Sequence, residues 1–205
     1  MISELQLPLA KLNLHPDEHQ LKQCDLFLAL LTKWNKVHNL TAIRDPAEML
    51  TKHLLDSLAV HPYITGQSIV DVGTGGGLPG IPLAILFPEK TFTLIDSNQK
   101  KISFVSHAIH TLGLENASAT ATRIENFAPP APVDTVISRA FSSICDMLAL
   151  TQHVISGQGQ FLAMKGAVPH EELSHLPEGF AVTAVHPLQI PGLNAQRCLI
   201  VVEKK

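Results

Sequence analysis

The sequence predicts an α/β fold in which a seven-stranded, mostly parallel sheet carries helices on both faces and a helical extension at its N-terminal end. Three observations predict it. A short apolar strand at 68–72 leads through a glycine-rich turn into a helix, which is how a nucleotide-type α/β domain opens. Strand and helix patterns then alternate along most of the chain, as expected for a parallel sheet. Residues 1–62, by contrast, show only helical periodicity.

The helical extension, residues 1–62, is predicted to be separate from a core domain at 63–205. Its first clear helix spans about residues 17–37. Apolar side chains recur there on one helical face, as an amphipathic helix requires. The residues on this face are Leu21, Cys24, Leu28 and Leu31.

A second helix of the extension is predicted to begin at Asp45-Pro46-Ala47-Glu48 and to reach about residue 60. Aspartate caps such a helix, proline fits its first turn, and glutamate reaches back from the third position. The linker between the two helices, Trp34 to Thr41, carries polar side chains. These side chains either face a ligand or only turn one helix into the next, and the spacing leaves both possibilities open.

The core domain is predicted to contain seven strands and four helices. Gly157-Gln158-Gly159 is expected to form a turn before the fifth strand, and Ser97 to cap the second helix. Only a loop joins the last two strands, so they can pair antiparallel. The predicted strands are 68–72, 91–96, 117–122, 133–138, 160–164, 181–185 and 197–202, and the predicted helices are 81–87, 98–112, 142–155 and 170–176.

The glycine-rich turn after the first strand is predicted to bind a nucleoside-type ligand. Asp71-Val72-Gly73-Thr74-Gly75-Gly76-Gly77 places glycine at every second position after an acidic residue, which resembles motif I of the S-adenosylmethionine-dependent methyltransferases. An acidic residue at the strand end suits the ammonium group of that cofactor. The segment Gly75 to Gly80 also fits the dinucleotide pattern G-x-G-x-x-G, but a run this rich in glycine fits several registers.

A second carboxylate, Asp96, ends the second predicted strand. An acid about 20 positions beyond the first glycine is placed to bind two ribose hydroxyls. Because S-adenosylmethionine and the nicotinamide cofactors both contain ribose, Asp96 supports a nucleoside ligand without choosing between them. The alternative interpretation is a helix cap before Asn98.

Composition narrows the classes of protein to consider. The formal net charge is −3, which disfavours strong sequence-independent binding to naked nucleic acid but leaves room for a local basic face. No apolar run approaches a membrane span and the N-terminus lacks a signal-peptide pattern, so we expect a cytoplasmic protein without a membrane partner. The three cysteines form no C-x-x-C pair, and His107 and His110 lack a carboxylate partner, so no metal is expected.

Five segments together resemble the RsmG family, also called glucose-inhibited division protein B, over nearly the whole chain. The first and fourth of them distinguish this family from other methyltransferases. Many relatives carry proline or alanine where this chain has Gly76, a departure that loosens the loop without changing the class of ligand. The segments are WNKVHNLTAIRDPAEMLTKHLLDS (34–57), DVGTGGGLPGIPLAI (71–85), LIDSNQKK (94–101), SRAF (138–141) and MKG (164–166).

The resemblance implies a Rossmann-like methyltransferase sheet with an N-terminal helical extension. It also implies an enzyme that uses S-adenosyl-L-methionine to methylate N7 of a guanine, position 527, in the 16S ribosomal RNA of the small ribosomal subunit. The expected partner is therefore 16S ribosomal RNA within that subunit, and the expected state of the protein is a monomer.

The motifs and the resemblance together imply a set of cofactor-binding residues. By the resemblance, Gly73 and Leu78 line the methionine part of the cofactor, Ile124 and Glu125 reach the adenine, and Arg139 touches the same site. Open α/β sheets bind ligands at the carboxyl ends of their strands, where these residues are predicted to lie. The full set is Asp71, Gly73, Gly75, Leu78, Asp96, Ile124, Glu125 and Arg139.

Arg139 and Lys165 follow the fourth and fifth predicted strands and are the expected catalytic residues. In the crevice, a cation can bind phosphate or guanine O6. The alternative interpretation is that both residues are ordinary surface charges. Guanine N7 has a free lone pair, so no general base is needed, and positioning and electrostatics carry the catalysis. RNA is expected to run over a basic face on the extension and the crevice rim. The substrate-binding residues expected there are Asn39, Arg44, His53 and Lys100.

Two other classes of function stay open at this point. A nicotinamide-dependent dehydrogenase would use the same first strand and the same Asp96. A non-catalytic RNA-binding or ribosome-binding module would bind RNA without methyl transfer. A methyltransferase acting on a small molecule is a variant of the main interpretation, and the basic extension argues against it.

Overall fold

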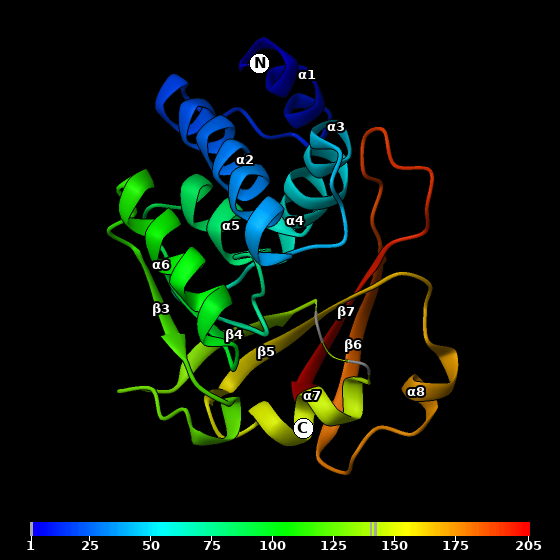
Figure 1. Ribbon diagram of the computed structural model, residues 1–205. Coiled ribbons are helices and arrows are strands. Elements are labelled where there is room, and N and C mark those ends of the chain that lie inside the picture. The colour runs from blue at the N-terminus through cyan, green and yellow to red at the C-terminus, as the bar shows by residue number, and fades with distance from the viewer. Residues whose placement is uncertain (1, 140, 142) are drawn as a thin grey trace.

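The computed structural model describes residues 2–139, 141 and 143–205. Its sheet has seven strands in the order β3-β2-β1-β4-β5-β7-β6, all parallel except β7, which runs antiparallel to both of its neighbours. This confirms the predicted seven-stranded, mostly parallel sheet and its antiparallel end (Figure 1). The strands are β1 (Ser68–Val72), β2 (Thr91–Asp96), β3 (Ala117–Ala121), β4 (Val133–Ser138), β5 (Ile155–Lys165), β6 (Phe180–Pro187) and β7 (Cys198–Lys204).

Helices cover both faces of the sheet, as predicted. Helices α1, α2, α5 and α6 lie on one side of it and α7 lies on the other (Figure 1). Within the described ranges, no helix is both long enough and apolar enough to cross a bilayer. The helices are α1 (Ile2–Lys11), α2 (Glu18–His38), α3 (Pro46–Met49), η1 (Leu50–Leu55), α4 (Asp56–Leu58), η2 (His61–Tyr63), α5 (Gly80–Leu86), α6 (Gln99–Leu112), η3 (Ile124–Asn126), α7 (Ile144–Thr151) and α8 (His170–Ser174).

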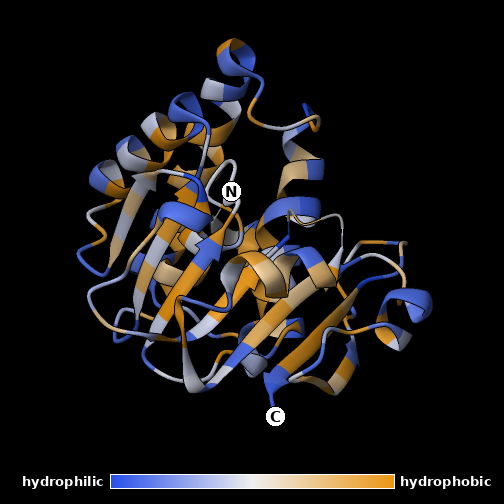
Figure 2. Ribbon diagram, turned by 90° about the horizontal axis from the view of Figure 1, so that it is seen from below, coloured by the Kyte–Doolittle hydropathy of each residue, from blue (hydrophilic) through white to orange (hydrophobic). Residues whose placement is uncertain are grey.

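Two hydrophobic clusters form the core, one on each face of the sheet. Successive residues of a strand point to opposite faces, so Ile69 belongs to one cluster and Val70 to the other. The central strands β1, β2 and β4 are mostly buried, whereas the edge strand β3 is only half-buried or exposed. In Figure 2 orange stretches of the strands alternate with paler and blue ones.

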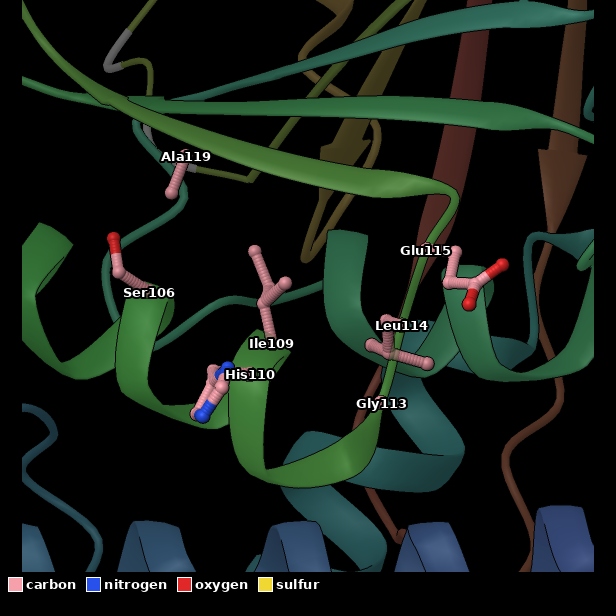
Figure 3. Close-up of a pocket in the computed structure, with 7 residues that line it drawn as sticks. All are labelled: Ser106, Ile109, His110, Gly113, Leu114, Glu115 and Ala119. Carbon is pink, nitrogen blue, oxygen red and sulfur yellow. The ribbon is translucent and has the colours of Figure 1, made fainter.

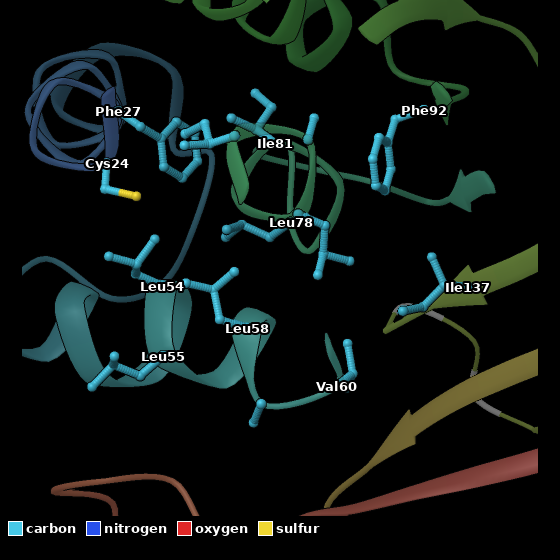
Figure 4. Packing of buried hydrophobic residues seen from close by; sticks show 14 of the residues in the cluster. Cys24, Phe27, Leu54, Leu55, Leu58, Val60, Leu78, Ile81, Phe92 and Ile137 are labelled. Carbon is cyan, nitrogen blue, oxygen red and sulfur yellow. The ribbon is translucent and has the colours of Figure 1, made fainter. Parts of the chain in front are cut away.

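The helical extension shares one of these clusters with the core domain. Phe27 of α2 and Leu54 and Leu58 of the following helices pack with Leu78 and Ile81 beside β1 (Figure 4). The predicted division between residues 62 and 63 falls within the short helix η2, and the apolar packing runs across it. The extension is therefore anchored to the sheet and does not hang from a linker.

The helix predicted from residue 46 to about 60 contains a π-helical segment, η1. Its wider turn ends where the N–H of Asp56 donates to the carbonyls of both Thr51 and His53. Two polar residues, His53 and Asp56, are buried there beside the leucines of the same helix. Local sequence patterns did not predict this segment, and π-helical turns often occur at functional sites.

Two local predictions were wrong. Asn98, and not Ser97, caps α6, because its Oδ1 accepts from the N–H groups of Lys100 and Lys101 at 3.0 and 3.4 Å. The segment Gly157-Gln158-Gly159 forms no separate turn, since β5 runs through it from Ile155 with an irregularity in its register against β4.

Glycine is required at the second of these positions. A Cβ atom on Gly159 would lie 2.8 Å from the carbonyl oxygen of Asp134 on β4. The glycines therefore mark a close approach of two strands, where the sequence suggested a chain reversal. The helix predicted at 142–155 is shorter, Ile144–Thr151, and its predicted first residue lies outside the described residues.

Candidate functional site

The candidate site lies at the carboxyl ends of β1 and β4, where the order of the strands reverses. Open α/β sheets bind ligands at this topological switch point. The glycine loop after β1 has positive φ angles of 72°, 58° and 78° at Gly73, Gly75 and Gly77. Such angles favour glycine and leave the backbone bare for close contact with a ligand.

A cavity of about 200 Å³ opens on this loop, and we call it the glycine-loop cavity. Gly73, Gly75 and Leu78 line it from the loop, and Arg139 lines it from the end of β4. Four residues predicted to bind the cofactor are thus brought together. Leu40 and Thr41 of the extension close the cavity from above the loop, so the linker between the two long helices does face the site.

Asp71 lies beneath the glycine loop and is 1% exposed. Its Oδ2 accepts from the Thr74 hydroxyl at 2.6 Å and from the Gly80 N–H at 2.9 Å, so the carboxylate fixes the shape of the loop. Its Oδ1 is buried and has no hydrogen-bond partner among the residues that the structure describes. An unpaired, buried carboxylate oxygen at this place fits a cationic group above the loop.

Burial raises the pKa of Asp71 to about 6, although the hydrogen bonds from Thr74 and Gly80 oppose the shift. A carboxyl group with a raised pKa stabilises the folded state most at low pH. That contribution is complete below the unfolded pKa of 3.8 and is lost as the pH rises through about 6.

We therefore predict that Asp71→Asn changes stability in a pH-dependent way. The amide oxygen can still accept both hydrogen bonds, but no buried charge forms. At pH 8 the variant should be more stable than the wild type by roughly 2–4 kcal/mol, and at pH 4 the two should be nearly equal. Urea unfolding at both pH values measures the difference. A variant that is equally destabilised at pH 4 and pH 8 would contradict the assignment.

Asp96 stands at the tip of β2, beside the glycine-loop cavity. Its Oδ2 accepts from the Gly75 N–H at 3.0 Å and its Oδ1 from the Asn98 N–H at 2.8 Å. Lys101 Nζ lies 3.7 Å from the same Oδ2. The carboxylate therefore joins the glycine loop to the start of α6, and each oxygen keeps a second acceptor position for a ribose hydroxyl.

Ile124 and Glu125 form the short helix η3, just after β3. The Ile124 side chain is buried, the Glu125 side chain is exposed, and neither residue lines the glycine-loop cavity. The main chain ties this region to Asp96, because the Thr122 N–H donates to the Asp96 carbonyl at 3.2 Å. The adenine contact expected of these two residues stays a prediction.

A second cavity, of about 410 Å³, adjoins the first, and we call it the cationic cavity. Arg139 lines both cavities. Lys165, from the end of β5, and Arg197, just before β7, also line the cationic cavity. The extension contributes Lys52, His53 and Asp56 to the same wall. The two predicted catalytic cations thus meet in one cavity beside the glycine loop.

Both cations are paired, which the sequence did not predict. Nη1 of Arg139 donates to Asp56 Oδ2 at 3.1 Å, and Nζ of Lys165 lies 3.5 Å from Glu172 Oε2. Lys165 also donates to the carbonyl of Phe141 at 3.3 Å. A second arginine, Arg197, donates from Nε to Asp56 Oδ1 at 2.9 Å.

His53 lines the cationic cavity but has both ring nitrogens engaged. Nδ1 lies 3.1 Å from the carbonyl oxygen of Lys52, which can only accept, so Nδ1 carries the proton. Nε2 then accepts from the Thr41 hydroxyl at 2.8 Å. Burial, followed by the nearby charge of Arg139, lowers the pKa of His53 to about 4. The ring is neutral at pH 7 and adds no positive charge to the cavity.

A family model described as rRNA small subunit methyltransferase G matches residues 20–201 of this sequence. The chain belongs to this family. The protein named Ribosomal RNA small subunit methyltransferase G from Saccharophagus degradans is 50% identical over 196 residues, which cover 96% of this chain and 88% of the relative. The protein of the same name from Escherichia coli (strain K12 / DH10B) is 45% identical over 203 residues, with 99% and 98% covered.

A solved structure supports the fold of this family member. The SAM dependent methyltransferase from Aquifex aeolicus aligns with a TM-score of 0.57 and covers 85% of this chain and 97% of its own. The two sequences are 15% identical, so this likeness concerns the fold alone. It confirms the predicted methyltransferase sheet.

Three of the predicted substrate-binding residues of this family member lie outside both cavities. Asn39 and Arg44 are exposed and contact each other, with Arg44 Nη2 donating to Asn39 Oδ1 at 3.3 Å. Lys100 is exposed in the first turn of α6. A role in RNA binding stays a prediction for all three, on the surface around the site.

Asp56 and Arg197 are site residues that the sequence did not single out. The one available signal was an acidic residue inside the apolar run Leu54-Leu55-Asp56-Ser57-Leu58. A buried carboxylate needs compensating charge, so this acid indicated a partner without revealing which one.

A further cavity, of about 740 Å³, lies between α1, α2 and α3, and its lining includes Lys33 and Lys36 together with Glu4 and Asp25. The cavity between α6 and β3 has Ile109 and Leu114 in its lining, together with the exposed His110 and Glu115 (Figure 3). Among the residues that the structure describes, no group of three or more histidine, cysteine or acidic side chains could hold a metal ion. His107 is exposed on α6, and its ring lies tilted against that of Trp34, with the ring centroids 5.2 Å apart.

Proposed function

We propose that this protein transfers a methyl group from S-adenosyl-L-methionine to N7 of a guanine in 16S ribosomal RNA, at position 527. One observation carries the proposal. In a member of the small-subunit rRNA methyltransferase G family, a glycine-loop cavity and a cationic cavity adjoin at the topological switch point, and Arg139 lines both. A cofactor in the first cavity and a nucleotide in the second would meet at Arg139.

The residues around the glycine loop fit the groups of this cofactor. The unpaired Oδ1 of Asp71 places negative charge beneath the loop, where an ammonium group is favoured. Asp96 offers its free acceptor positions to the ribose, and Leu78 gives an apolar wall for the methionine chain. The chemistry that S-adenosylmethionine supplies is an electrophilic methyl group on a sulfonium.

The cationic cavity is suited to holding a nucleotide, and the carboxylate among its described lining residues, Asp56, is held by Arg139 and Arg197 and is not free to act as a general base. Guanine N7 needs none, because its lone pair is already free. His53 is neutral and uses its only free lone pair to accept from Thr41, so it neither removes a proton nor repels the substrate. Arg139 and Lys165 bring positive charge toward the guanine O6 and the phosphates, which orients N7.

The target guanine must leave any helix before it reaches this cavity. In an A-form RNA helix N7 faces a deep, narrow groove that protein side chains do not read. The nucleotide must therefore be unpaired or flipped out. Exposed cations on the extension, among them Lys33, Lys36 and Arg44, would provide phosphate contacts for the flanking RNA.

The strand order disfavours the dehydrogenase that the sequence left open. A dinucleotide-binding sheet has the order 3-2-1-4-5-6 with parallel strands, whereas here the antiparallel β7 is inserted between β5 and β6.

The proposal includes a cytoplasmic monomer that acts on the small ribosomal subunit. It also includes residues 1–62 as an RNA-facing unit and 63–205 as the cofactor-binding unit.

We predict that the assembled subunit is methylated faster than deproteinised 16S RNA. A protein of net charge −3 has limited sequence-independent attraction for RNA, so affinity depends on local basic residues and on shape. Ordering a flexible RNA loop costs binding energy that a folded subunit has already supplied. Initial rates of tritiated methyl transfer to undermethylated subunits and to naked RNA measure the difference, and the rate on subunits should fall as salt rises. Equal rates on both substrates would refute this preference.

A further inference from the structure

We propose that Asp56 is a positioning residue that holds Arg139 between the two cavities and Arg197 in the cationic cavity. The inference rests on the proposed function, because it assigns Asp56 a role in orienting cations for RNA methylation. Asp56 would contact neither the cofactor nor the guanine. It would act through the two arginines.

The geometry places Asp56 at the junction of three parts of the chain. The residue is 2% exposed and begins α4 of the extension. Its Oδ2 binds Nη1 of Arg139, at the end of β4, and its Oδ1 binds Nε of Arg197, just before β7. Each carboxylate oxygen thus holds one arginine. Through this side chain the extension contacts both arginines that line the cationic cavity, one after β4 and one before β7.

The bonds leave part of each guanidinium available. Arg139 donates from Nη1 to Asp56 and, at 3.4 Å, to the carbonyl of Lys52. Arg197 donates from Nε to Asp56 and from Nη1 to the carbonyl of Gln196. In the part of the chain that the structure describes, Nε and Nη2 of Arg139 and Nη2 of Arg197 donate no hydrogen bond. These donors remain for a phosphate or a base.

The charges around the cavity make Asp56 necessary for this arrangement. Asp56 is the only acidic residue among the described residues that line the cationic cavity. The neighbouring cations have other partners, since Lys165 pairs with Glu172 and Lys52 with Glu48. Without the carboxylate, Arg139 and Arg197 would repel each other and would lose the charged partner that they share.

Asp56→Asn tests the inference, and Glu48→Gln is the matched control. Both changes remove one negative charge from the same helical region, but Glu48 is exposed and lines neither cavity. With undermethylated small subunits as substrate, Asp56→Asn should lower kcat by roughly ten- to hundred-fold, as expected for misplaced groups. KM for subunits should stay level or fall, because the cavity gains net positive charge. Glu48→Gln should match the wild type.

A measurement that does not depend on activity tests whether Asp56 orients the arginines, separately from whether the protein methylates RNA. In NMR spectra, the Nε–H of Arg197 should exchange slowly with solvent in the wild type and in Glu48→Gln, and much faster in Asp56→Asn. The role of Asp56 would be overturned if the Arg197 Nε–H of Asp56→Asn exchanged as slowly as in the wild type and if kcat, counted per molecule that binds cofactor, stayed within two-fold of the wild type. Methylation that is absent even in the wild type, with the same change in exchange, would overturn the proposed function and leave the positioning intact.

A second variant keeps the test valid if Asp56→Asn folds poorly. The side chain of Arg197 is 29% exposed, whereas that of Asp56 is 4% exposed. Arg197→Gln should therefore disturb the protein interior less than Asp56→Asn does. It should raise KM for subunits or lower kcat. If Asp56 acts through this arginine, the double variant should lose less than the product of the two single losses. Fully multiplicative losses would contradict the inference.

Discussion

Arg139→Ala is expected to lower the rate of methyl transfer to small ribosomal subunits by about a hundred-fold or more, because it removes a cation that lines both cavities. Electrostatic groups aimed at a reacting centre contribute effects of this size, and positioning adds to them. The change also leaves Asp56 with only Arg197 as an ion-pair partner. Initial rates at saturating cofactor and subunits measure the loss.

The control for this variant is Lys22→Ala. It removes one positive charge from the exposed face of α2, where Lys22 pairs only with the exposed Glu18. This variant should keep the wild-type rate and a wild-type circular dichroism spectrum. If Arg139→Ala is folded, binds cofactor and still transfers methyl groups within two-fold of the wild type, then the junction of the two cavities is not the site of reaction.

Gly77→Ala is expected to lower the free energy of unfolding by about 2–5 kcal/mol. Gly77 has a φ of 78°, and an alanine there is disfavoured by about 1–2 kcal/mol. Its Cβ would also overlap Cδ1 of Ile81, which is fully buried, so overpacking adds about 1–3 kcal/mol. The displaced loop should also bind S-adenosylmethionine more weakly.

Gly113→Ala separates the effect of backbone strain from the effect of the contact with Ile81. Gly113 ends α6 with a φ of 66°, and a Cβ there would meet nothing within 4 Å. Its substitution should cost only the backbone strain, about 1–2 kcal/mol, with unchanged cofactor affinity. Urea unfolding and calorimetry with the cofactor measure both effects. Equal losses of stability in the two variants would show that the contact with Ile81 does not constrain the loop.

The sheet could be predicted from the sequence because its signals are local. Each strand is an apolar run bounded by turn residues, and burial on both faces makes that run nearly continuous. The glycine loop was predicted for a similar reason, since Gly73, Gly75 and Gly77 occupy positions that other residues adopt only with strain. Asp71 and Asp96 followed from their places at the ends of two strands.

The pairing of the site cations could not be predicted, because it depends on contacts between distant parts of the chain. Asp56 lies 83 positions before Arg139 and 141 positions before Arg197. The antiparallel insertion of β7 brings Arg197 to the cavity, and the sequence suggested the hairpin but not its place beside β5. The π-helical turn before Asp56 depends equally on tertiary packing.

The residues predicted to bind RNA show a second reason why sequence-based prediction is incomplete. His53 was interpreted as part of a basic face, yet it is buried and hydrogen-bonded at both nitrogens, because the helix that carries it packs against the sheet domain. Asn39, Arg44 and Lys100 are exposed, but surface position alone does not identify a contact with RNA.

A map of N7-methylguanine in ribosomal RNA tests the central claim most directly. RNA from cells that contain this protein, cells that lack it, and cells complemented with Arg139→Ala would be cleaved chemically at N7-methylguanine. We predict one modified guanine in 16S RNA, at position 527, that is present with the wild-type protein and absent from the other two. A map that is identical with and without the protein, or a modification on a base other than guanine, would contradict the account.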